Sequence, residues 1–287
     1  MDACAFPKGR WMSAKVDLYD NAYANYGAEV YRQIRVETYG DDFGQTSWVT
    51  TAESREIPRT LGLTPNSYVL EIGCGSGQYA LQVAGTVGCR VLGVDINLSG
   101  IDNANQLAIA RKISGQVHFE KCDVSKKLPF DNATFDAAFA NDVLCHIPNR
   151  ADALRELYRV IRVSGRLLFS DALVVCGMIS NQEIAARSSI GYYIFSPPGE
   201  NERLLQQERF QVVSATDTTE NAAQIARRWH DARQKRRDEL LPIEGEGTFN
   251  GVQQFLSTVH TLTSEGRLRR YVYVAEKPDD TGDFTGE

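Results

Sequence analysis

The 287-residue sequence predicts an α/β protein built around a doubly wound, mostly parallel sheet. Strand-like apolar runs alternate with helical stretches from about residue 67 to residue 175, which is the pattern of such a sheet. A turn with three glycines spaced two apart joins the first strand to a helix within residues 69–80. Because glycine takes left-handed backbone angles and has no Cβ, a ligand can press against this turn and reach the free N–H groups of the following helix.

Further apolar runs justify the rest of the parallel sheet. We predict strands at residues 90–96, 117–124, 135–142 and 165–171, with an amphipathic helix around residues 151–163 before the last of them. Acidic side chains follow the second and third strands. Each acid alone is typical of a turn at a strand end, but their joint order and spacing favour a shared binding role.

Beyond residue 175 the pattern changes, and we expect a helical cap and a closing strand. The predicted elements are helical stretches within 180–207 with a break at 196–199, a strand at 210–215, two helices within 219–266 and an alternating strand at 269–276. The predicted organisation is one sizeable core with additions. Its parts are an N-terminal tail and helical lid (1–66), the core (67–177), a substrate cap with one core strand near 210–215 (178–266), and the final strand and tail (267–287).

Composition narrows the function classes. Hydrophobic residues make up 43% and charged residues 24% of the chain, and no apolar run approaches the roughly 20 residues of a membrane span. Residues 1–11 lack the apolar segment of a signal peptide, and we expect them and residues 278–287 to be disordered tails. The six cysteines form no C-x-x-C pair, which favours reduced thiols and a cytoplasmic protein.

The net charge of −6 argues against nucleic acid as a partner, because binding a phosphate backbone needs a concentrated basic surface. One basic run lies at residues 227–237, interrupted by Asp231. We interpret it as a solvated helix face, with a docking surface for an anionic substrate group as the alternative.

The glycine turn reads Glu71-x-Gly73-x-Gly75-x-Gly77, and Gln78 stands where the dinucleotide fingerprint needs a glycine. This form resembles motif I of the class I S-adenosylmethionine (SAM)-dependent methyltransferases, which have a Rossmann-like sheet whose last strand is antiparallel. The resemblance implies that the acid supports the loop and that the glycines contact the methionine part of SAM.

The acids at the later strand ends fit the same resemblance. A carboxylate at Asp95 can accept both hydroxyl protons of a ribose. In the family, the acid that matches Asp123 accepts a hydrogen bond from the adenine amino group. The predicted cofactor-binding residues are therefore Glu71, Gly73, Gly75, Gly77, Asp95, Ile96, Asp123, Val124, Asn141 and Tyr31.

A narrower resemblance concerns the N-terminal segment. The pattern Tyr23-x-x-x-Gly27-x-x-Val30-Tyr31 looks like the lid of the phosphoethanolamine methyltransferases, on one helix that also carries Tyr19 and Tyr26. This implies a mobile lid, for which Gly27, Gly40 and Gly44 offer flexible points.

An Asp-x-x-x-His element follows the fourth strand, as in that family, and consists of Asp142 and His146. Spacing of four predicts that both side chains share one helical face. Phosphate recognition departs from the family pattern, because Asn141 replaces an arginine and Ala172 a tyrosine; phosphobase substrates are therefore not expected. The similar sarcosine and dimethylglycine methyltransferases share the Asp-x-x-x-His element without those anchors, and sugar or natural-product O-methyltransferases share the core and the histidine.

The predicted catalytic residues are His146, Asp142 and Tyr23. Methyl transfer from SAM needs mainly alignment, exclusion of water and removal of a proton. Histidine suits the last task because its ordinary pKa lies near 6.5. Asp142 would orient the imidazole or anchor an ammonium, and tyrosine faces could hold a methylated ammonium. The alternatives are a packed helix histidine and a tyrosine stripe that belongs to the core.

We therefore predict a SAM-dependent methyltransferase that modifies a small molecule, with an amine nitrogen as the expected acceptor. The alternatives are an O- or C-methyltransferase of natural-product biosynthesis and a non-catalytic SAM-binding protein. No metal is expected, because no His/Asp/Glu cluster with ligand spacing appears beyond Asp142 and His146. The expected partners are the small-molecule acceptor alone, without nucleic acid or membrane, and a monomer or homodimer.

Overall fold

A computed structural model describes residues 16–43 and 46–279. The tail expected at residues 1–11, most of the one expected at 278–287, Cys4 and Gly44 lie outside these ranges. Within the described residues, Cys74, Cys89, Cys122, Cys145 and Cys176 are free thiols. No helix in the described ranges is both long and apolar enough to cross a membrane.

A seven-stranded sheet forms the centre of the described chain, with strand order β3-β2-β1-β4-β5-β7-β6. Strands β1 to β5 pair in parallel, and β7 is antiparallel to both of its neighbours. This confirms the predicted doubly wound fold with an antiparallel last strand. The strands are β1 (Tyr68–Ile72), β2 (Arg90–Asp95), β3 (Val117–Lys121), β4 (Phe135–Ala140), β5 (Ile161–Val175), β6 (Gln211–Asp217) and β7 (Leu268–Glu276).

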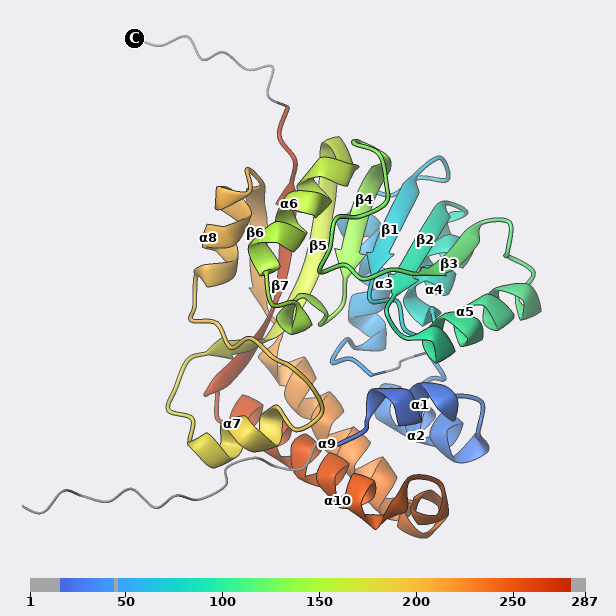
Figure 1. The fold of residues 1–287 in the computed structure, drawn as a ribbon, viewed down its shortest axis with the longest axis vertical. Coiled ribbons are helices and arrows are strands. Elements are labelled where there is room, and N and C mark those ends of the chain that lie inside the picture. Colours follow the sequence, from blue (N-terminus) through green and yellow to red (C-terminus); the bar gives the residue numbers. More distant parts are fainter. Residues whose placement is uncertain (1–15, 44–45, 280–287) are drawn as a thin grey trace, which may run out of the picture.

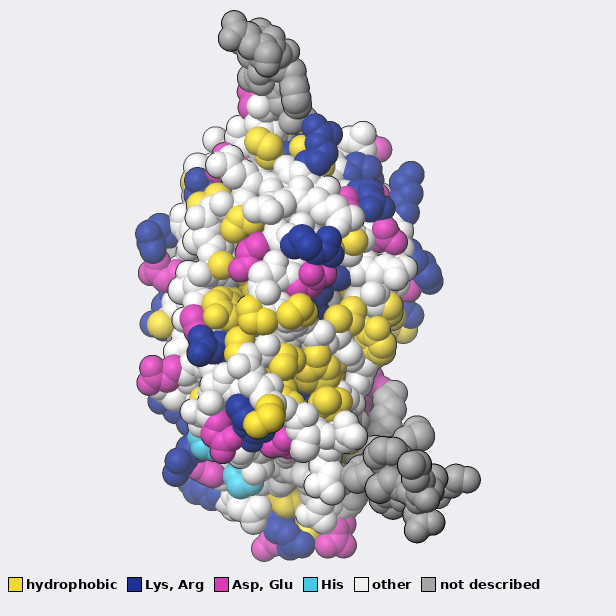
Figure 2. Space-filling view, turned by 90° about the vertical axis from the view of Figure 1, so that its left-hand side faces the viewer, with side chains coloured by type: hydrophobic (Ala, Val, Ile, Leu, Met, Phe, Trp, Pro, Cys, Tyr) yellow, Lys and Arg dark blue, Asp and Glu magenta, His cyan; other side chains and the backbone are white. Residues whose placement is uncertain are grey.

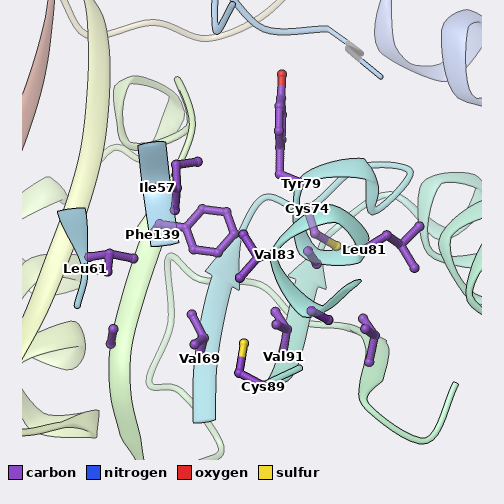
Figure 3. Packing of buried hydrophobic residues seen from close by; sticks show 14 of the residues in the cluster. Ile57, Leu61, Val69, Cys74, Tyr79, Leu81, Val83, Cys89, Val91 and Phe139 are labelled. Atoms are coloured by element: carbon purple, nitrogen blue, oxygen red, sulfur yellow. The ribbon is translucent and has the colours of Figure 1, made fainter. Parts of the chain in front are cut away.

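Alternating side chains of the strands bury both faces of the sheet. Val69 of β1 packs with α3 (Thr51–Thr60), α4 (Gln78–Val87) and α5 (Leu98–Ala110), and Figure 3 shows part of this cluster, in which Phe139 lies beside Val69 and Val83. Leu70, the next residue, packs on the opposite face with α6 (Arg150–Val160) and α8 (Glu200–Gln207). The core is therefore a three-layer sandwich that fixes the strand ends.

The remaining helices form a cap at one end of the sheet, below it in Figure 1. They are α1 (Tyr19–Ala24), α2 (Glu29–Tyr39), α7 (Asn181–Arg187), α9 (Thr219–Lys235) and α10 (Arg237–Ser264). An apolar cluster that includes Ile34, Trp229 and Phe255 joins α2, α9 and α10, so the segments predicted as lid and cap pack together. An ion pair adds to this contact: Nη2 of Arg236, between α9 and α10, lies 2.5 Å from Oε1 of Glu37 in α2.

Several predicted boundaries are wrong. The tyrosine-rich segment forms two helices rather than one, with Tyr26 in the turn between them. The helix expected to reach residue 163 ends at Val160, because β5 begins there and runs past the predicted 165–171. In the stretch 180–207, residues 188–199 are not helical.

The basic run at residues 227–237 is only in part a solvated face. Arg233 is buried and pairs with Glu244, and Arg236 is buried against Glu37. Figure 2 shows the face of the molecule that carries α8 and β6: Lys and Arg side chains there are interspersed with Asp and Glu, and hydrophobic side chains form a band across the middle. A concentrated basic surface is absent from this view of the described chain.

Candidate active site

The glycine turn after β1 has the backbone geometry that only glycine adopts easily. Gly73 and Gly77 have φ angles of 68° and 77°. A Cβ on Gly73 would lie 2.3 Å from a methyl carbon of Val143, and one on Gly77 would lie 2.7 Å from the Cβ of Ala104. The turn therefore packs closely on its surroundings at these two positions. The N–H groups of Gly73 and Cys74 both donate to the carbonyl oxygen of Val94, which ties the turn to β2.

Glu71 lies under this turn and is 1% exposed. Its Oε2 atom accepts the N–H of Ala80, in the first turn of α4, at 3.0 Å. Burial raises the pKa of the Glu71 carboxyl well above its ordinary range, against the lowering effect of the Ala80 N–H. Glu71 therefore links the strand to the helix across the loop rather than facing a ligand.

Asp95, at the end of β2, faces an open cleft. Its Oδ2 atom accepts the N–H of Gly75 and its Oδ1 atom that of Asn97, each at 2.8 Å. Because a carboxylate oxygen can accept more than one hydrogen bond, both oxygens keep capacity for ribose hydroxyls. Burial raises the pKa of this carboxyl, and the backbone N–H groups oppose the effect. The neighbouring Ile96 is 64% exposed, which suits an apolar ring contact at the rim.

The cleft has a volume of about 730 Å³, within the range of ligand pockets in proteins. Six of the ten predicted cofactor residues line it: Gly73, Asp95, Ile96, Asp123, Val124 and Asn141. The buried Nδ2 atom of Asn141 has no hydrogen-bond partner among the described residues, so it can donate to a bound ligand. Glu71, Gly75 and Gly77 do not line the cleft and shape it from behind.

Asp123 lies past the end of β3 and is tied to a local turn. Its Oδ1 atom accepts the hydroxyl and the N–H of Ser125, and its Oδ2 atom pairs with Lys126 at 3.0 Å. These bonds lower the pKa of the carboxyl, with the Ser125 hydroxyl as the largest cause. Asp123 is thus ionised at the mouth of the cleft.

His146 lies at the inner end of the cleft, on a 3₁₀ turn at Leu144–His146. Its Nδ1 atom is 2.9 Å from the carbonyl oxygen of Tyr192. A carbonyl only accepts, so Nδ1 carries the proton, and in the neutral ring Nε2 is left as an acceptor. The hydroxyl of Tyr19 donates to Nε2 at 3.2 Å. The imidazole is therefore held in the tautomer that can take a proton at Nε2.

Asp142 and His146 do not share a helical face as predicted. Asp142 precedes the 3₁₀ turn with a left-handed φ of 59°, and its carboxylate lines the same cleft as His146 without a hydrogen bond to it. Oδ1 accepts from the hydroxyl of Ser170 at 2.8 Å and from Nε of Arg270 at 2.9 Å, and Oδ2 accepts from the N–H of Trp48 at 2.9 Å. Asp142 has three protein partners and none of them is His146.

The lid tyrosines divide between two places. Tyr23 lines the cleft, and its hydroxyl bonds to Thr46 at 2.9 Å. Tyr31 does not line it: its hydroxyl donates to Glu244 of α10 at 3.1 Å, so it belongs to the contact between lid and cap. Tyr19, one helical turn before Tyr23, is the lid residue that reaches His146.

The sequence analysis missed two residues of this region. The ring of Tyr193 lies 4.3 Å from that of His146, and the guanidinium of Arg187 lies 4.4 Å from the Tyr193 ring. Both come from the segment after β5, where no motif marks them. The only signal was the position of the segment within the expected cap. In the described ranges, no group of three His, Cys, Asp or Glu side chains could hold a metal ion.

Comparison with known proteins places these features in a family. A model described as "Methyltransferase domain" matches residues 70–169. The O-methyltransferase cnsE of Penicillium expansum is 32% identical over 203 residues, which cover 69% of this chain and 68% of that enzyme. A phosphoethanolamine N-methyltransferase of Triticum aestivum is 26% identical over 83% of this chain, but the match covers 46% of the wheat enzyme.

A solved structure shows the same fold. The phosphoethanolamine N-methyltransferase 2 of Haemonchus contortus, in complex with phosphomonomethylethanolamine and S-adenosylhomocysteine, superposes with a TM-score of 0.76 and 19% identity. The match covers 96% of this chain and 62% of that one.

Proposed function

Because this chain belongs to the class I SAM-dependent methyltransferases, with a small molecule as acceptor, we propose that the acceptor atom is an oxygen and that His146 removes its proton. The family accounts for the fold and the cofactor. The choice of oxygen over nitrogen is our proposal, and it modifies the amine acceptor expected from the sequence.

The observation that carries this choice is the state of Asp142. An anionic side chain is the strongest anchor for an ammonium acceptor, and Asp142 was the candidate. Its carboxylate is already paired with Arg270 and accepts hydrogen bonds from Ser170 and Trp48, so most of its acceptor positions are in use. Displacing Arg270 from Asp142 would leave this buried guanidinium with Glu53 alone as its carboxylate partner among the described residues, which costs free energy. The carboxylate is therefore a poor site for a substrate cation.

The cofactor residues have separate tasks in this proposal. SAM, when bound, supplies a methyl group activated by a sulfonium. Asp95 would hold the ribose hydroxyls, Ile96 and Val124 would enclose the adenine ring, and Asp123 would accept from its amino group. The free donor of Asn141 suits the carboxylate of the methionine part. The missing Cβ of Gly73 leaves room for the side chain of Val143, and the Gly73 backbone itself lines the cleft.

His146 then acts on the acceptor. An acceptor hydroxyl that replaces the hydroxyl of Tyr19 would donate to Nε2 and lose its proton there as the methyl group arrives. The resulting charge on the imidazole is spread toward the Tyr192 carbonyl through the Nδ1 proton. Tyr23 lies beside the cofactor cleft and would close it against water.

The second candidate is an amine nitrogen, which the name of the wheat relative favours. Turnover with SAM against paired phenols, enols and amines tests the choice, with S-adenosylhomocysteine as the readout and mass spectrometry to locate the methyl group. We expect methylated oxygen. Methylation of amines alone would overturn the oxygen proposal and keep the family assignment.

Two further expectations belong to the proposal. Turnover continues in EDTA, because a hydroxyl, a positioned histidine and SAM suffice for the chemistry; full loss with recovery on adding Mg²⁺ would contradict it.

The free cysteines of the described chain favour a reducing compartment such as the cytoplasm.

A further inference from the structure

Arg187 ends helix α7 and is 1% exposed. It lines a small enclosed cavity together with His146, Tyr19 and Tyr193. The cavity has a volume of about 10 Å³, roughly the space for one water molecule. An acceptor can enter only if side chains around it move, and Tyr19, which comes from the lid, is one of its walls.

Arg187 differs from the other buried arginines in the described chain. Each of the others forms an ion pair with a carboxylate: Arg35 with Asp42, Arg150 with Asp171, Arg233 with Glu244, Arg236 with Glu37, and Arg270 with Asp142 and Glu53. No carboxylate among the described residues pairs with Arg187. Its Nε and Nη1 atoms are buried and have no hydrogen-bond partner there.

The aromatic rings around Arg187 compensate only in part for the missing ion pair. Its guanidinium carbon lies 4.4 Å from the centre of Tyr193, 5.1 Å from that of Phe255 and 5.8 Å from that of Trp48. A cation over an aromatic ring gains less free energy than the burial of a charge without an opposite charge costs. The site is therefore built to receive an anion.

We propose that Arg187 binds an anionic oxygen of the methyl acceptor, as a carboxylate or enolate, while a neighbouring hydroxyl faces His146. This inference rests on the proposed function and names its substrate class. One ring, that of Tyr193, contacts both the imidazole and the guanidinium. An acceptor that spans the width of one ring can reach both groups.

The chemistry of the cavity selects the kind of anion. Arg187 is the only Lys or Arg among the described lining residues, and the one lining carboxylate there, Asp142, is paired with Arg270. One negative charge of a ligand is therefore matched, and the second charge of a phosphate is not. Trp48, Tyr193, Trp229 and Phe255 surround the space and favour a flat, conjugated body. The guanidinium fork fits the two oxygens of a carboxylate. A hydroxylated aromatic or polyenoic acid has these features.

The first test measures binding of benzoate and of its neutral analogue benzamide by calorimetry, with and without saturating S-adenosylhomocysteine. We expect benzoate to bind at least tenfold more tightly than benzamide to the wild type. Arg187→Met removes this preference, Arg187→Lys keeps part of it, and the exposed Arg203→Met on α8 leaves it intact. Equal binding of the two probes, no saturable binding of benzoate, or a preference that survives Arg187→Met would each overturn the proposal.

The second test needs no ligand. If Arg187 is kept for an anion, Arg187→Met in the ligand-free protein keeps or raises the unfolding temperature, because a similar apolar side chain replaces an unpaired charge. Benzoate then raises the unfolding temperature of the wild type and not of the variant. A variant that unfolds well below the wild type would show that Arg187 serves stability and would contradict the proposal.

Failure of this inference is distinguishable from failure of the proposed function. Binding of S-adenosylhomocysteine and turnover of neutral phenols test the methyltransferase assignment alone. Loss of the benzoate preference with cofactor binding intact removes only the role of Arg187.

Discussion

Arg270 donates from Nε to the Oδ1 atom of Asp142 at 2.9 Å, and both side chains are buried. The pair joins the segment after β4 to β7, and Arg270 also reaches Glu53 of α3 at 2.6 Å. Burial lowers the pKa of the Arg270 guanidinium, but the two carboxylates raise it by more, so the pKa lies above its ordinary value. An acid that the sequence suggested for catalysis thus pairs with a buried arginine of the framework while it lines the cleft.

Asp142→Ala should therefore lower the free energy of unfolding by about 3–5 kcal/mol, since it leaves the Arg270 charge buried with one fewer anion. Urea denaturation measures this. Ser170→Ala is the matched comparison, because it removes the hydroxyl that donates to the same carboxylate and accepts the Asp142 N–H, but it leaves both charges paired; it should cost about 1.5–3 kcal/mol, less than Asp142→Ala. If Asp142→Ala keeps wild-type stability and only turnover falls, Asp142 acts on the substrate after all.

His146→Ala should lower kcat by about a hundredfold or more while binding of S-adenosylhomocysteine is nearly unchanged. The pH profile should lose its acidic limb. Tyr19→Phe is the control: it removes the hydroxyl that donates to Nε2 and should cost at most about tenfold, since one hydrogen bond contributes roughly 0.5–1.5 kcal/mol.

Burial raises the pKa of the Tyr19 hydroxyl well above 10, so it stays protonated between pH 6 and 9 and adds no limb to the profile. If His146→Ala keeps the wild-type kcat across this pH range, His146 is not the base.

Asp95→Ala should weaken SAM binding by more than tenfold. Hydrogen bonds from ribose hydroxyls to a carboxylate contribute roughly 1.5–3 kcal/mol each. The change also frees the N–H groups of Gly75 and Asn97, so the turn itself loosens. Calorimetry with SAM and with NAD checks both affinity and cofactor identity, and Asp123→Ala at the rim should cost less. Unchanged SAM affinity in Asp95→Ala would refute the ribose assignment.

SAM should protect the amide hydrogens of residues 16–43 from exchange. This lid reaches the core through amide side chains of α5: Asn103 donates to the Tyr23 carbonyl and Asn97 to Asp20, each at 2.7 Å. Because Tyr19 and Tyr23 line the cleft, a bound ligand adds contacts to the same helix. Amides of α8, which contributes no residue to the cleft lining, serve as the internal control. Equal exchange in the lid with and without SAM speaks against a ligand-ordered lid.

Glu71→Gln should stabilise the protein increasingly as pH rises above about 4.5. The ordinary pKa of a glutamate is 4.5, and burial raises that of Glu71 in the folded state. Between these two pKa values the folded chain holds a proton that the unfolded chain has lost, so stability falls as pH rises. Glutamine does not titrate, so the variant lacks this loss of stability with rising pH.

Urea denaturation between pH 4 and 8 measures the effect of Glu71→Gln, with the exposed Glu246→Gln as control. A stability difference that does not change with pH would show that Glu71 titrates like an exposed carboxyl.

The local pattern of the sequence determined the sheet and the cofactor side of the site. A glycine is required at position 73 because the turn there is left-handed and packs against a close neighbour. The position of Asp95 can be predicted because it ends a buried strand. Both features depend on residues near each other in the chain and on the rule that parallel strands end at one edge. For the same reason a mostly parallel, doubly wound sheet could be predicted without any long-range contact.

The tertiary structure alone decided the acceptor side. Asp142 meets Arg270 across 128 positions of the chain, and His146 meets Tyr19 across 127. The pairing of the Arg187 guanidinium is likewise decided by its surroundings: three aromatic rings pack around it, and no carboxylate of the described chain forms an ion pair with it. The charge state and freedom of a side chain depend on which distant segments fold against it, and no local spacing encodes that. The sequence therefore predicted which cofactor this protein uses, and only the packing around Arg187 shows that a guanidinium without an ion-pair partner among the described residues lines the same cavity as His146.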